Sequence, residues 1–190
     1  MKKTLVLIGL IALPGLATAA DQLETYRQDS RAIVGPFMQQ LMAENKKAIT
    51  EGGPESAVKV CKDIAPKLAG DISRQQGIKL TRVSLKVRNP MLGTPDAWEQ
   101  KMLKSFEKRA AKGEKTDAME AAEIVSEPGG KYFRYMKAIT LQPGCVACHG
   151  VPESISESTR ARLAEEYPHD QATGYEPGQI RGAVSLKRPL

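Results

Sequence analysis

The stretch KLTRVSLKV, residues 79–87, indicates the fold class, because its side chains alternate with a period of two. One face carries the side chains of Thr81, Val83, Leu85 and Val87. This is the period of a strand with one buried face. A second stretch, IRGAVSLK at 180–187, alternates in the same way. The sequence therefore predicts two half-buried strands, one in the middle of the chain and one near its end.

The segment before the first strand has helical spacing. Its apolar residues include Leu23, Tyr26, Ile33, Phe37 and Leu41. Gly35-Pro36 is expected to kink this helix or split it. A second helix is expected to start near Pro54 and to carry Cys61 on an apolar stripe, with its later half distorted by Pro66.

Between the two strands the sequence predicts a helix, a hairpin and a second helix. Thr94-Pro95-Asp96 is typical of a helix cap, and Gly113 lies near the expected end of that helix. Residues 121–125 and 131–141 flank a turn-forming stretch and predict a hairpin. Residues 152–167 predict a short helix before Pro168. Helices followed by strands with short connections predict an α+β domain built on an antiparallel sheet.

The pentapeptide CVACH, residues 145–149, has the spacing used for covalent attachment of haem c. Each thiol adds to a vinyl group of the porphyrin, and the next residue reaches the iron. We therefore expect one covalent haem on Cys145 and Cys148, with His149 as its proximal ligand.

Three other interpretations of this motif remain open. A thioredoxin-type pair would follow a strand and open a helix, whereas Gly and Pro flank this motif on both sides. A structural zinc ion needs four ligands, and only Cys61 and His169 remain to complete a set. A disulfide between Cys145 and Cys148 would close a small, strained ring. Haem attachment is the interpretation favoured here.

The first residues predict export. Lys2 and Lys3 precede an apolar run at 5–13 and the small residues 17–19, the pattern of a secretory signal. We expect cleavage near Ala19 or Ala20, a periplasmic location, and no transmembrane segment in the mature chain. The expected organisation is a signal peptide at 1–20 and a single domain at 21–190.

The charge is modestly basic. The formal net charge is +6, and loss of the two signal lysines would lower it by two. Such a balance is only a weak bias toward acidic partners, and solvated charged faces are the default interpretation. No Lys/Arg block is interleaved with aromatic residues, so no nucleic-acid partner is expected.

Several stretches together resemble one bacterial family. They are CKDIAP at 61–66, VSLKVRNP at 83–90, PDAWE at 95–99, CVACHG at 145–150, DQATGY at 170–175 and GQIRGA at 178–183. They resemble the exported single-haem c-type proteins with a PAS-like sheet, long classed as a domain of unknown function. The resemblance covers nearly the whole mature chain. It implies a PAS-like fold with N-terminal helices, haem on Cys145 and Cys148, and His149 on the iron.

The resemblance also implies that Cys61 is the second axial ligand of the iron. The residues alone leave this open, because a cysteine on an apolar stripe is by default a small buried hydrophobe. Rival ligands are His169 and the methionines Met38, Met42, Met102 and Met136. Four arginines are candidates to pair with the haem propionates: Arg82, Arg88, Arg134 and Arg181. Arg88 and Arg181 are preferred, because they lie within the family-like stretches.

Two classes of function follow from these expectations. The first is one-electron transfer, with protein ligands on both sides of the iron and a redox partner protein. The second is a haem-based redox or gas sensor that signals through a separate partner protein. An enzyme such as a peroxidase is not expected, because no distal acid/base pair stands out.

Overall fold

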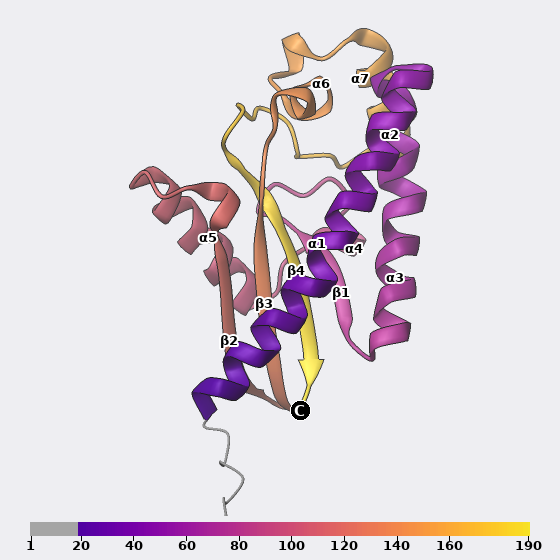
Figure 1. Cartoon of the computed structure of the whole chain (residues 1–190). Coiled ribbons are helices and arrows are strands. Elements are labelled where there is room, and N and C mark those ends of the chain that lie inside the picture. The colour runs from indigo at the N-terminus through magenta and orange to yellow at the C-terminus, as the bar shows by residue number, and fades with distance from the viewer. Residues whose placement is uncertain (1–18) are drawn as a thin grey trace, which may run out of the picture.

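The computed structural model describes residues 19–190 and is shown in Figure 1. The signal segment predicted from the sequence lies outside these residues, apart from Ala19 and Ala20, with which helix α1 (Ala19–Gly52) begins. Within the described part of the chain, no helix has the length and apolar character needed to cross a membrane.

Four strands form one antiparallel sheet in the order β1-β4-β3-β2. They are β1 (Lys79–Val83), β2 (Glu120–Glu127), β3 (Gly130–Thr140) and β4 (Ile180–Pro189). β4 pairs with both β1 and β3, so it lies inside the sheet. The α+β class with N-terminal helices and an antiparallel sheet is confirmed.

Two helices cover one face of the sheet. Figure 1 shows α1 crossing the strands diagonally, with α3 (Ala65–Gln76) beside β1. The core on this face gathers Val34, Phe37, Leu41, Ala65, Leu80, Phe133, Tyr135, Val184 and Leu186. α1 is not split at Pro36 but runs through it. Burial of its apolar stripe against the sheet holds the helix together where the Pro removes one hydrogen bond.

The opposite face is covered by α5 (Ala97–Ala111). Asp96 and Glu99 form the capping box that starts this helix. Its buried residues pack against the other side of the strands, on Val83, Met119, Met136, Ala138, Ile180 and Ala183. Both faces of β4 are therefore buried, whereas the alternation predicted only one.

The second predicted helix is divided into three parts. α2 (Pro54–Lys59) continues into a π-helical segment, η1 (Val60–Ile64), and then into α3. Pro66 has no N–H to donate to the carbonyl four residues earlier. The N–H of Ala65 bonds instead to the carbonyl of Val60, five residues back. The expected distortion by Pro66 is thus a π-turn, and Cys61 lies in it.

The remaining helical elements are short. They are α4 (Pro90–Gly93), η2 (Thr116–Ala118), η3 (Pro143–Cys145), α6 (Val146–His149), η4 (Pro152–Ser154) and α7 (Glu157–Glu166). β1 ends at Val83 rather than at Val87, because the N–H of Ser84 bonds to the carbonyl of Gly93 instead of continuing the ladder with β4. Figure 1 places α6 and α7 beyond the end of β3 and the start of β4.

Candidate functional site

The CVACH motif folds into a single compact turn. Cys145 ends η3, and the next four residues form α6. The N–H of Gly150 closes the turn on the carbonyl of Val146 at 2.8 Å. Cys145 and Cys148 are free thiols, each partly buried. The strained disulfide considered as an alternative is therefore not formed.

The segment 170–175 holds this turn in place through the backbone. The N–H of Gly174 donates to the carbonyl of Gly150 at 2.8 Å, and the N–H of Tyr175 donates to that of His149 at 3.0 Å. Leu141 and Gln179 continue the pairing of β3 with β4 toward the motif, with an N–H to carbonyl distance of 2.9 Å. The sheet thus determines where the motif lies.

The imidazole of His149 is oriented by a backbone carbonyl. Its Nδ1 lies 2.7 Å from the carbonyl oxygen of Ala172, which can only accept a hydrogen bond. The proton is therefore on Nδ1, and Nε2 keeps its lone pair for a metal. Arg181 Nε lies 3.1 Å from the same Nδ1, but a protonated nitrogen cannot also accept from it. Burial, together with the positive charges of Arg88 and Arg181, holds the pKa of His149 well below its usual value.

Arg88 ties the motif to the 170–175 segment. Its Nε donates to Asp170 at 3.0 Å, and its Nη2 donates to the carbonyl of Cys148 at 2.5 Å. The second Asp170 oxygen accepts the N–H of Ala172 at 2.7 Å. Arg88 is only 9% exposed. The guanidinium of Arg88 therefore already binds groups of the protein, and it supports the backbone of the motif.

Arg181 has a different environment. Its Nη1 donates to Ser84 Oγ at 2.8 Å and to the carbonyl of Lys86 at 3.2 Å, and its guanidinium lies 5.5 Å from the ring of Tyr175. These partners are neutral, and burial lowers the pKa of Arg181. Among the described residues no carboxylate forms an ion pair with Arg181. Its guanidinium can therefore bind a carboxylate of a ligand.

The thiol of Cys148 contacts the start of α2, and the thiol of Cys61 contacts α1. Cys148 Sγ lies 3.8 Å from the carbonyl oxygen of Pro54, and Cys61 Sγ lies 3.8 Å from Asn45 Oδ1. Burial raises the pKa of the Cys148 thiol to about 11, Arg88 opposes this, and Cys61 and Cys145 add to it. Reactive redox thiols have a lowered pKa, so the raised pKa of Cys148 does not fit a redox-active thiol pair.

The family model of the Tll0287-like proteins matches residues 16–189, which include every residue of this site. The chain belongs to the Tll0287-like family. The resemblance seen in the sequence is thereby confirmed. No curated protein sequence matches the chain.

A solved structure shares the Tll0287-like fold. It is the crystal structure of the cyanobacterial haem protein Tll0287, with a TM-score of 0.63 and 23% sequence identity. The match covers 85% of this chain and 95% of that chain. At this identity the likeness shows the fold.

The rival iron ligands of this Tll0287-like chain lie in varied places. His169 is exposed in a turn, and Met42 is 55% exposed on α1. Met136 is fully buried beneath α5, and Met38 and Met102 pack at the edges of the two cores. No group of three or more His, Cys, Asp or Glu within residues 19–190 is placed to hold a metal ion.

Two further residues of the Tll0287-like site were not predicted from the sequence. Ala172 contributes only its carbonyl, and Asp170 holds Arg88 and the backbone of the same segment. Both lie in the DQATGY stretch, which was the one available signal.

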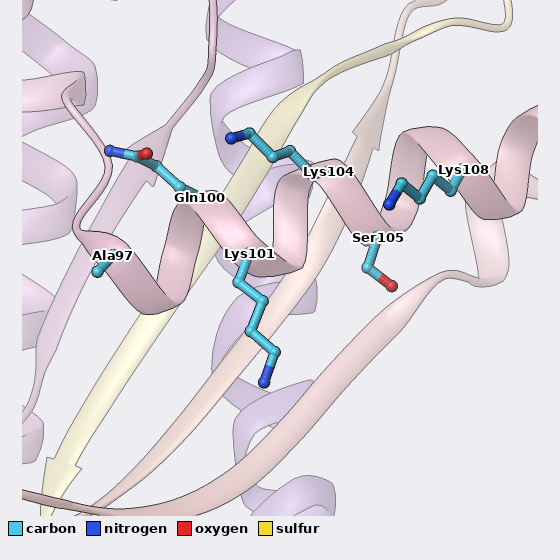
Figure 2. Close-up of a pocket in the computed structure, with 6 residues that line it drawn as sticks. All are labelled: Ala97, Gln100, Lys101, Lys104, Ser105 and Lys108. Carbon is cyan, nitrogen blue, oxygen red and sulfur yellow. The ribbon is translucent and has the colours of Figure 1, made fainter.

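A hollow of about 500 Å³ lies away from this site, on the outer face of α5 (Figure 2).

Proposed function

We propose that this protein is an exported monohaem c-type protein that carries single electrons between partner proteins. Haem c would be held by thioether bonds to Cys145 and Cys148, with His149 on the iron. The observation that carries the proposal is the bond from His149 Nδ1 to the carbonyl of Ala172, which leaves Nε2 free to bind a metal. The structurally similar protein Tll0287 is itself a haem protein, which supports the proposal.

The protein's own groups fit this role. A histidine whose second nitrogen donates to a carbonyl is fixed in tautomer and orientation and is a stronger ligand. Both cysteines of the motif are free to react with a vinyl group. Bound haem would supply the redox-active iron, and the donor set in the fold suits it.

We assign Cys61 as the second axial ligand and Arg181 as the partner of a propionate. Cys61 is close enough to Cys148 to affect its pKa, and it lies in a π-turn, a feature common at functional sites. Arg181 has only neutral partners, whereas Arg88 already binds Asp170. Of the two arginines preferred from the sequence, Arg181 is therefore the better anchor for a propionate.

Attachment is tested by extraction and mass. The exported protein should retain its haem under acidic acetone and should show the mass of one haem on a chain beginning at Ala20 or Asp21. Cys145→Ala and Cys148→Ala should each sharply reduce this attachment, whereas Cys61→Ser should keep it. Haem that extracts freely, or one zinc ion per chain, would contradict the proposal.

Carbon monoxide distinguishes electron transfer from sensing. Ligands fixed on both sides of the iron keep reorganisation small, so we expect the reduced protein to exchange electrons rapidly and to bind carbon monoxide poorly. The π-turn around Cys61 favours the alternative, because a ligand there is less tightly held by its helix. Rapid carbon monoxide binding with loss of the Cys61 ligand would favour a sensor that signals through a separate partner.

A further inference from the structure

A row of lysines runs along the outer face of α5 and into the loop that follows it. All five are exposed; they are Lys101, Lys104, Lys108, Lys112 and Lys115. The first four are spaced by three or four residues, so they share one side of the helix. Leu103 and Phe106 are on the other side and are buried in the core. The lysines therefore form one basic stripe, which we name the α5 lysine face.

This face lacks ion pairs of the kind found on α3 and α7. Lys67 pairs with Asp71 on α3, and Arg162 pairs with Glu165 and Glu166 on α7. On α5 the ion pairs belong to Glu99, which binds Arg134, and to Arg109, which binds Glu114. In the described part of the chain no carboxylate pairs with any lysine of the α5 lysine face. Like charges at this spacing repel one another, so the helix carries an unbalanced positive field.

The shape and chemistry of the face suit a polar partner. Figure 2 shows Lys101, Lys104 and Lys108 around a hollow that Ala97, Gln100 and Ser105 complete. No large apolar side chain lines it. A helix that enters a lipid surface needs exposed Trp, Phe or Leu, so a membrane fits this face poorly.

The helix that carries this face also borders the proposed haem site. Leu103 and Glu107 of α5 line a small hollow together with Tyr175 and Arg181. The helix that carries the lysines thus borders, on its other side, the groups that surround His149. Weak electron-transfer complexes have small interfaces that rely on complementary charge.

We propose that the α5 lysine face is the docking surface for an acidic partner protein that exchanges electrons with this one. The redox part of this inference rests on the proposed function, whereas the preference for an acidic protein surface rests on the lysines themselves. Long-range attraction steers such a partner to the face and sets its orientation. Binding should therefore weaken steeply with added salt.

The test uses the exported protein as purified, whatever its haem content, and a fluorescent polyglutamate peptide as the probe. Lys104→Glu with Lys108→Glu should weaken peptide binding about tenfold at low ionic strength, as measured by anisotropy. The matched control is Lys79→Glu with Lys131→Glu, two exposed lysines at the starts of β1 and β3, with the same change in charge. It should change binding less than about twofold.

Equal weakening by the two double variants would overturn the inference, because net charge alone would then explain binding. Vesicles of phosphatidylglycerol are the second probe. If they bind the protein through Lys104 and Lys108 while the peptide does not, the face is a membrane surface and the inference is wrong. The peptide measurement does not depend on haem chemistry. Failure of covalent attachment would thus refute the proposed function and leave the result for the face intact.

Discussion

The Nδ1 atom of His149 lies 2.7 Å from the carbonyl oxygen of Ala172, a residue that contributes no functional side chain. The carbonyl is held in turn by its own segment, because Asp170 accepts the N–H of Ala172 and binds Arg88. A main-chain group therefore determines which ring nitrogen of His149 is free. Substitutions in the groups around this ring should accordingly alter both the stability of the fold and the chemistry of the site.

Cys61→Ser should raise the reduction potential and change the ferric spin-resonance spectrum. A thiolate stabilises ferric iron relative to ferrous iron, and serine does not replace it. We expect a rise of about 60 mV or more, which is a tenfold change for a one-electron couple. Covalent haem should stay, because Cys145 and Cys148 are untouched. An unchanged spectrum and potential would direct attention to His169 or a methionine.

Arg181→Gln should lower the potential. A half-buried positive charge beside His149 would favour reduced iron, so its removal should shift the potential down by on the order of 50 mV. The matched control is Arg160→Gln on α7, where the arginine is exposed and donates to the carbonyl of Pro152. Redox titration measures both. Equal shifts in the two variants would exclude a specific role for Arg181.

Arg88→Ala should destabilise the protein by about 3 kcal/mol, because it leaves a partly buried carboxylate and the Cys148 carbonyl without their donor. Urea unfolding of Arg88→Ala, Asp170→Ala and the double variant forms a double-mutant cycle. We expect a coupling of at least about 1 kcal/mol. Additive losses would mean that the two side chains act independently.

Gly150→Ala should disturb the motif turn. A Cβ at Gly150 would lie 2.7 Å from the carbonyl oxygen of Val146 and 2.8 Å from Ser154 Oγ, so the backbone must shift. The expected cost is about 1–3 kcal/mol, with a lower fraction of covalent haem. Gly144→Ala is the control, because a Cβ there meets nothing within 4 Å. The free energy of unfolding and the haem content of Gly144→Ala should equal those of the parent protein, whereas both should fall in Gly150→Ala.

Glu120→Gln should reduce the loss of stability in acid. Burial acts to raise the pKa of Glu120, but hydrogen bonds from Arg31 and Tyr135 outweigh it and lower the pKa below its ordinary value near 4.5. A carboxyl with a lowered pKa stabilises the fold at any pH above its ordinary pKa. This stabilisation is lost as the pH falls through the pKa of the folded state. We expect about 1 kcal/mol between pH 7 and pH 3, measured by urea unfolding. The matched control is the exposed Glu51→Gln, which makes the same change in charge.

The sequence predicted most elements, because their patterns are local. The Asp96 cap, the hairpin of β2 and β3 and the start of α2 at Pro54 all follow from short-range rules. The alternation through Val87 misled, since a pattern does not show where the partner strand stops pairing. β4 pairs with β1 only as far as Val83.

Sequence patterns indicate candidate side chains but not backbone groups. CVACH predicts roles for Cys145, Cys148 and His149, and these roles stay predictions, whereas a carbonyl such as that of Ala172 has no signature in sequence. The sequence also preferred Arg88 and Arg181 equally as partners of the propionates, because it carries no tertiary information. Only the fold brings Asp170 to one of them and neutral partners to the other.

The central position of β4 affects the timing of assembly. β4 pairs with both β1 and β3, yet it follows residues 145–149 along the chain. A growing polypeptide therefore exposes Cys145 and Cys148 while β1 and β3 still lack the strand that joins them. Under the proposed function, the two thiols would then be accessible to a haem-attaching catalyst before the sheet closes. Maturation of the site can thus precede the last step of folding.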